Sequence, residues 1–80
     1  MKLSVYSLKQ ILFQGSASLL NCKTVMGEIT VLDNHETLIT VLSAGLIKIV
    51  DLNKKEHFFP IKSGFLEVKS ENEARCIVEQ

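Results

Sequence analysis

The chain offers few side chains that could carry acid–base, thiol or metal chemistry. It contains two histidines, His35 and His57, and two cysteines, Cys22 and Cys76. No HExxH, GxSxG or EF-hand spacing is present, so the sequence indicates neither a hydrolytic site nor a metal site. A phosphate-binding loop of the GxxxxGKS/T or GxGxxG kind is absent too. We therefore expect a protein that is not an enzyme and has no cofactor.

Each of these four side chains has an ordinary structural explanation. His57 follows Glu56 in an expected strand, where it would be an exposed cross-strand neighbour. His35 lies in a polar segment between two expected strands, where functional residues concentrate, and a turn histidine explains it about equally well. Cys22 and Cys76 are far apart in the chain and form no CxxC motif. We expect two reduced, unpaired thiols, half-buried on strands.

Charge and composition exclude two kinds of partner. Nine Lys and Arg balance nine Asp and Glu, so the chain lacks the positive field that attracts nucleic acid. There is no apolar run long enough to span a bilayer, and the first residues lack the apolar run of a signal peptide. With 46% hydrophobic and 22% charged residues, the chain should fold. We expect a cytosolic protein with no nucleic-acid partner and no direct membrane insertion.

A period of two in the hydrophobic pattern dominates the chain and predicts its fold class. We expect one all-β domain over residues 1–80, a flattened sandwich or barrel of eight to ten short strands. No helix longer than a turn or two is expected. The expected strands are residues 3–7, 11–13, 16–22, 28–32, 37–42, 46–52, 56–61, 65–69 and 74–79, with a stop at Gly15.

Three local features refine this prediction. Residues 53–55 and 70–73 are polar and turn-prone, and each should connect a pair of strands as a hairpin. Pro60 should place its strand at a sheet edge, because proline cannot donate a ladder hydrogen bond. Residues 46–52 carry apolar side chains on both faces, which suits a strand between the core and a second contact surface.

Residues between Met26 and Ile49 follow the order and spacing of a known family. They form a Gly-Glu pair, a histidine, a Leu/Thr-rich strand and a glycine that opens an Ile/Lys-rich strand: Gly27, Glu28, His35, Leu38, Thr40, Gly45 and Ile49. This series resembles the epsilon subunit of rotary ATP synthases. The similarity also covers residues 12–15 and 63–68 without an insertion, and so extends over nearly the whole chain.

The chain departs from the family pattern at two loops. The family's Pro-Gly-His-x-Pro-Leu loop is replaced by residues 33–38, which lack both prolines and the glycine. Asn34 tolerates a positive φ and Asp33 can form an Asx turn, so we expect the bend to survive. The family's paired glycine is reduced to Ser63-Gly64, and we expect Gly64 to lie where the chain bends.

The resemblance implies a connector in the central rotor of a proton- or sodium-translocating ATP synthase. One sandwich face would bind the gamma subunit and one loop would touch the c-ring, so that torque passes between ring and shaft. The chain would be peripheral, at the cytoplasmic face of the inner membrane. The implied c-ring contacts are Met26, Gly27, Glu28 and Ile29, and the implied gamma contacts are His35, Glu36, Thr40, Leu46 and Lys48.

Two of these residues have plain alternative explanations. Glu28 alone would be a solvated turn carboxylate, whose exposed ion pair contributes only about 0–1 kcal/mol. Thr40 alone would be a routine strand residue. Many family members continue into a C-terminal helical hairpin that can bind ATP and act as a brake. This chain stops after the expected β domain, so we expect neither the brake nor a nucleotide site.

Two other classes of protein remain as alternatives. A stand-alone β-sandwich module that binds a carbohydrate or peptide would have an aromatic-lined groove, and 6% aromatic residues with no Trp argue against it. A small enzyme would need a cluster of polar residues with shifted pKa values, and the sparse histidines and cysteines offer none.

Overall fold

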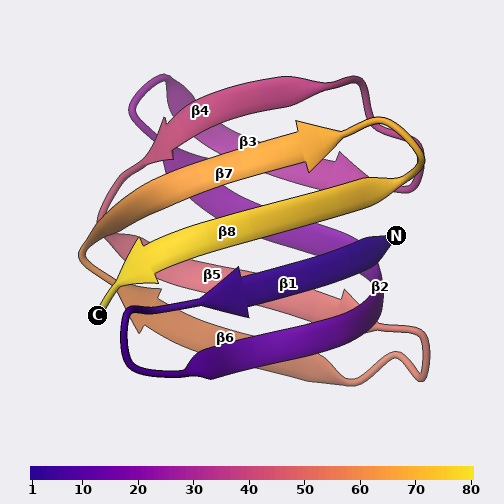
Figure 1. Cartoon of the computed structure of the whole chain (residues 1–80), viewed down its shortest axis with the longest axis horizontal. Coiled ribbons are helices and arrows are strands. Elements are labelled where there is room, and N and C mark those ends of the chain that lie inside the picture. Colours follow the sequence, from indigo (N-terminus) through magenta and orange to yellow (C-terminus); the bar gives the residue numbers. More distant parts are fainter.

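The computed structural model covers residues 1–80 and contains strands and turns but no helix (Figure 1). The eight strands are β1 (Lys2–Tyr6), β2 (Ile11–Thr24), β3 (Gly27–Leu32), β4 (Leu38–Leu42), β5 (Gly45–Asp51), β6 (Glu56–Ile61), β7 (Ser63–Lys69) and β8 (Glu73–Glu79). The prediction of an all-β sandwich of eight to ten strands is confirmed.

The strands form two layers, and β2 belongs to both. In the first layer, the N-terminal part of β2 pairs with β1, and β8, β7 and β4 follow in that order. In the second layer, the C-terminal part of β2 lies between β3 and β5, and β6 pairs with β5. Figure 1 shows β4, β7, β8 and β1 in front of β3, β5 and β6.

The predicted break at Gly15 is wrong, because β2 runs without interruption from Ile11 to Thr24. Gly15 stays in the ladder opposite Leu3 of β1. The pairing of β2 with β5 shifts register between Ala17 and Leu19, as at a β-bulge. Ala17 and Leu20 are both buried despite their odd spacing. Because of this change of phase, buried and exposed residues do not alternate regularly through the middle of β2.

The core lies between the layers and draws side chains from every strand. Its largest fully buried members are Leu3, Leu20, Leu42, Ile47, Ile49 and Leu66. Cys22 and Cys76 belong to it as free thiols and are fully buried rather than half-buried. Burial raises the pKa of Cys22 to about 11 and also raises that of Cys76, so both sulfurs are protonated and unreactive at neutral pH.

The β5–β6 hairpin forms as its polar loop predicts. Lys54 has a φ of 64°, and Asp51 Oδ1 accepts hydrogen bonds from the N–H groups of Asn53 and Lys55 at 2.8 and 3.0 Å. The other carboxylate oxygen of Asp51, Oδ2, lies 3.0 Å from His57 Nε2. The edge position predicted from the proline in β6 is confirmed, since β6 pairs with β5 alone.

The glycine in β7 has a different role from the one expected. Gly64 does not mark a bend, because it lies within β7, paired with Leu42 of β4 and Val78 of β8. A Cβ at this position would be 2.5 Å from the backbone oxygen of Ile77 and 3.0 Å from the Cα of Val78. Glycine is therefore needed because the backbones of β7 and β8 approach closely here.

Candidate functional site

The β2–β3 hairpin presents an apolar tip to solvent. Its loop consists of Val25 and Met26, which are 62% and 89% exposed. The Thr24 hydroxyl accepts a hydrogen bond from the Met26 N–H at 3.1 Å and donates one to the Gly27 carbonyl at 2.7 Å. Gly27 has a φ of 121°, a conformation that favours glycine. The sequence thus builds a tight hairpin that holds Met26 outward, and we call its turn, residues 24–27, the Met26 hairpin.

The other residues predicted for ring contact lie beside this tip rather than on it. Glu28 is exposed on the outer face of β3, where its Oε2 accepts a hydrogen bond from Asn21 Nδ2 at 3.0 Å. Ile29 is half-buried and packs against the core. The exposed Val25 was not predicted, although the short spacing between Thr24 and Gly27 is a signal for the loop.

The loop that contains His35 lies at the opposite end of the sandwich from the Met26 hairpin (Figure 1). The His35 N–H donates to the Leu32 carbonyl at 3.3 Å, and His35 Nδ1 lies 2.8 Å from the Glu36 carbonyl oxygen. Asn34 has a φ of 61°, as expected for a residue that replaces glycine. The bend therefore survives without the family's prolines and glycine.

The predicted Asx turn at Asp33 is not formed, because its carboxylate has other partners. Asp33 Oδ1 accepts hydrogen bonds from the Met1 ammonium at 2.5 Å and from Asn72 Nδ2 at 3.2 Å. The Met1 ammonium also donates to the Ala17 carbonyl at 2.7 Å. These contacts fasten the His35 loop to β1, β2 and the β7–β8 turn, and the ammonium lowers the pKa of Asp33.

Acid should weaken this fold through Asp33 and Asp51. The pKa of Asp33 is lowered by hydrogen bonds from the Met1 ammonium and Asn72, and that of Asp51 is lowered first by its hydrogen bond with His57. A carboxyl group with a depressed folded pKa contributes stability above its unfolded pKa of about 4 and loses that contribution as pH falls through the folded value. We expect the urea midpoint to be steady from about pH 7 to 5 and to fall below about pH 4.

Single substitutions test whether the Asp51 carboxyl group contributes to this loss of stability in acid. Asp51→Asn should reduce the acid-induced fall of the midpoint, because the amide cannot take up the proton. Glu36→Gln is the matched control, since Glu36 is exposed and makes no ion pair. An identical fall in the wild type and in Asp51→Asn would contradict the assignment.

The five residues predicted to contact gamma do not share one surface. His35 and Glu36 lie in the β3–β4 loop. Thr40 is half-buried in β4 and pairs with the buried Leu66 of β7. Leu46 and Lys48 lie on the outer face of β5, in the other layer. The structure therefore divides the five among three places, and only Leu46 and Lys48 lie together on an exposed sheet face.

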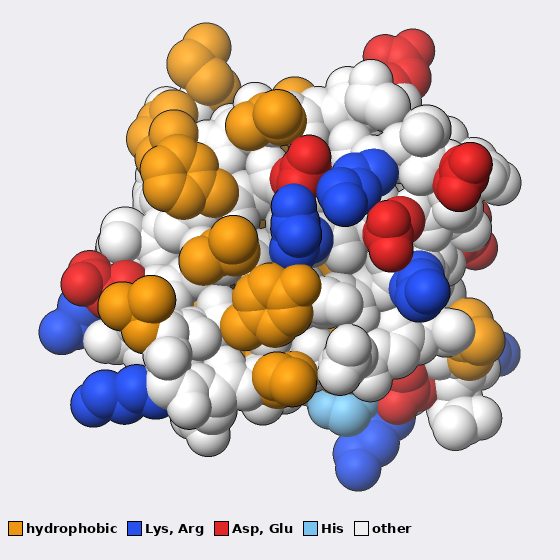
Figure 2. All heavy atoms as spheres, viewed as in Figure 1, with side chains coloured by type: hydrophobic (Ala, Val, Ile, Leu, Met, Phe, Trp, Pro, Cys, Tyr) orange, Lys and Arg blue, Asp and Glu red, His pale blue; other side chains and the backbone are white.

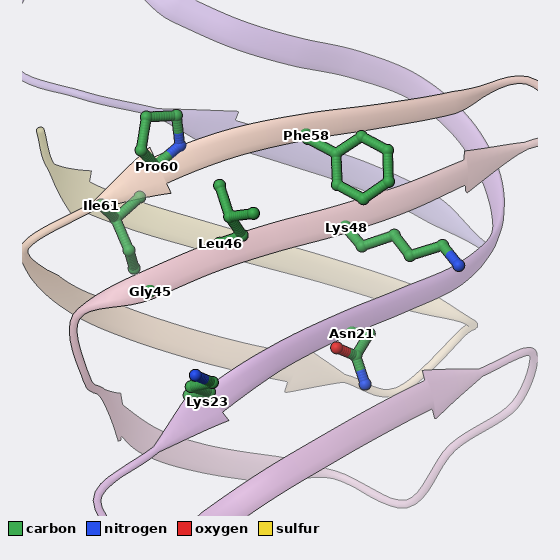
Figure 3. Close-up of a pocket in the computed structure, with 8 residues that line it drawn as sticks. All are labelled: Asn21, Lys23, Gly45, Leu46, Lys48, Phe58, Pro60 and Ile61. Atoms are coloured by element: carbon green, nitrogen blue, oxygen red, sulfur yellow. The ribbon is translucent and has the colours of Figure 1, made fainter.

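Leu46 and Lys48 belong to a continuous surface on the second layer, which we call the Leu46 surface: Lys23, Leu46, Lys48, Phe58 and Pro60 (Figure 3). Leu46 pairs with Pro60 across β5 and β6, and Lys48 pairs with Phe58. On the opposite face of β5, Ile47 and Ile49 are fully buried. The prediction of a strand with apolar side chains on both faces is thus confirmed.

A second exposed apolar surface crosses the first layer and was not predicted. Register pairs align Val41, Phe65, Ile77, Tyr6 and Ile11 in one row across β4, β7, β8, β1 and β2. All except the half-buried Tyr6 are exposed. Figure 2 shows apolar side chains gathered over one side of this face and charged ones over the other. We call these residues the cross-strand row.

The structure offers no cluster for metal chemistry. No group of three or more His, Cys, Asp or Glu side chains is close enough to hold a metal ion. No helix is present that could cross a bilayer. The surface does offer exposed apolar side chains on the β2–β3 hairpin tip, the Leu46 surface and the cross-strand row, and such groups are typical of protein contacts.

Comparison with known proteins identifies the fold family. All 80 residues match the family described as the β-sandwich domain of the ATP synthase delta/epsilon chain. The chain belongs to this family. The resemblance found in the sequence is thereby confirmed, and the two layers described above are the sandwich of the delta/epsilon family.

Curated relatives and solved structures agree with the delta/epsilon assignment. The ATP synthase epsilon chains of Acinetobacter baumannii (strain SDF) and Hydrogenovibrio crunogenus are each 33% identical over 69 residues, or 86% of this chain. These matches cover 50% and 47% of the relatives, so the chain spans about half their length.

Chains in the Euglena gracilis mitochondrial ATP synthase and the Tetrahymena thermophila ATP synthase central stalk and c-ring share the fold over 100% of this chain. Their TM-scores are 0.92 and 0.83, at 18% and 16% identity, and the matches cover 51% and 63% of those chains.

Proposed function

We propose that this chain is a non-catalytic central-stalk subunit of a rotary ATP synthase, linking gamma to the c-ring and supporting the coupling of ion flow to ATP synthesis. The observation that carries the proposal is the delta/epsilon family match over residues 1–80. Residues 1–80 would act as one domain, peripheral to the membrane at its cytoplasmic face. Neither a cofactor nor a nucleotide is needed for this linking role.

The geometry supports separate contacts for the two partners. The Met26 hairpin, with Glu28 beside its tip, is proposed to meet the polar loops of the c-ring. The Leu46 surface is proposed to bind gamma, because Leu46 and Lys48 share one exposed, largely apolar face. His35, Glu36 and Thr40 do not lie on that face, so the gamma contact rests on Leu46 and Lys48.

Charge reversal at Glu28 tests the ring contact. Glu28→Lys should reduce proton or sodium pumping by the reassembled complex roughly twofold to fivefold, as expected for the loss of one exposed ion pair. Binding of purified gamma should change less than pumping, because Glu28 lies on β3, opposite Lys23 at the border of the Leu46 surface and not among the residues that form it. Pumping and a gamma pull-down would be measured on the same preparations.

Glu71→Lys is the matched control for this experiment. Glu71 is exposed in the β7–β8 turn, at the far end of the sandwich from the Met26 hairpin, so its reversal should leave pumping intact (Figure 1). Melting temperatures would establish that both variants are folded. If Glu28→Lys lost gamma binding as strongly as pumping, the two surfaces would be misassigned.

A further inference from the structure

The Leu46 surface contains a cation without an acidic partner. Lys48 Nζ pairs with Glu56 Oε2 at 3.1 Å. Lys23 is exposed and makes no ion pair. Glu28 lies opposite Lys23 across β2 and β3, but its carboxylate accepts a hydrogen bond from Asn21 instead. The Lys23 ammonium is therefore free to bind a group from outside the chain.

The aliphatic stem of Lys23, which extends from β2, packs over the backbone of β5 at Gly45. A Cβ on Gly45 would lie 3.1 Å from Lys23 Cδ, so the bare glycine leaves the space that the lysine stem occupies. Leu46 and Phe58, which are 54% and 51% exposed, lie on β5 and β6 beside it. Together they border a shallow hollow of about 560 Å³ (Figure 3).

We infer that the segment of gamma seated on the Leu46 surface carries an apolar side chain next to a carboxylate. The apolar side chain packs against Leu46 and Phe58, and the Asp or Glu carboxylate accepts a hydrogen bond from the Lys23 ammonium. The inference rests on the proposed gamma contact and specifies the chemistry of the partner. An unpaired lysine beside an apolar patch favours an acidic segment and discriminates against a basic one.

The test measures the affinity of the 80-residue chain for purified gamma by calorimetry, at low and at physiological salt. Lys23→Glu opposes the partner's carboxylate and should weaken binding roughly tenfold, while Lys23→Gln should weaken it roughly threefold to fivefold. Lys23→Gln should also flatten the salt dependence, because an exposed ion pair is screened by salt. Lys54→Glu, an exposed change in the β5–β6 loop, should bind like the wild type.

Failure of this inference differs from failure of the proposed function. If Leu46→Asp weakens binding while both Lys23 variants bind like the wild type, the gamma contact stands and the acidic segment is refuted. Tighter binding by Lys23→Glu would show that the partner segment is basic and would also overturn the inference. If the folded wild-type chain does not bind gamma at all, the proposed function fails together with the inference.

Discussion

Replacing Gly64 by alanine should lower the free energy of unfolding by about 3 kcal/mol. That is a large share of the roughly 4–12 kcal/mol expected for a chain of this length. The added Cβ would be 2.5 Å from the Ile77 carbonyl oxygen and 3.0 Å from the Val78 Cα. Both atoms belong to the backbone of β8, so relief requires β7 and β8 to separate and cannot come from rotation of a side chain.

Urea denaturation followed by circular dichroism measures this effect. Ser63→Ala is the matched control, because Ser63 is the preceding residue of β7, is exposed, and donates only a 3.3 Å hydrogen bond to Glu79. Its free energy of unfolding should stay within about 0.5 kcal/mol of the wild type. Equal urea midpoints for Gly64→Ala and Ser63→Ala would show that β8 yields without cost and that the close approach is unimportant.

Alternation in the sequence predicts burial correctly where a strand stays in one layer and keeps one face toward the core. Leu3 and Val5 of β1, and Ile47 and Ile49 of β5, are buried at the period of two that the sequence shows. The same reasoning fails in β2, because this strand passes between layers and shifts register near Ala17. A bulge depends on the partner strand, so the local pattern of β2 alone does not reveal it.

The candidate surfaces are predictable from the sequence to different degrees. Leu46 is found because its own strand is apolar on both faces. The cross-strand row is missed because Phe65 and Ile77 become neighbours only through the pairing of β7 with β8, which no single strand shows. Asp33 is misread for a similar reason, since the Met1 ammonium that it binds lies far away in the sequence.

Replacing Leu46 by aspartate should weaken binding of gamma by about 2–4 kcal/mol, roughly 30-fold to 1,000-fold in Kd. The new carboxylate would be desolvated at the centre of the Leu46 surface, where the proposed partner places an apolar side chain. It would also compete with the partner's carboxylate for Lys23. The unfolding free energy should change little, because Leu46 is 54% exposed and points away from the core. Calorimetric titration of gamma into the folded variant measures the loss.

Phe65→Asp provides the comparison that decides which sandwich face binds gamma. The side chain of Phe65 is 58% exposed, a fraction similar to the 54% of Leu46, but Phe65 belongs to the cross-strand row on the first layer. We expect Phe65→Asp to bind gamma like the wild type. If Phe65→Asp loses binding and Leu46→Asp keeps it, the gamma contact belongs to the cross-strand row, while membership of the delta/epsilon family is untouched. If both variants bind normally, neither Leu46 nor Phe65 lies in the gamma contact, and the proposed contact on the Leu46 surface is wrong.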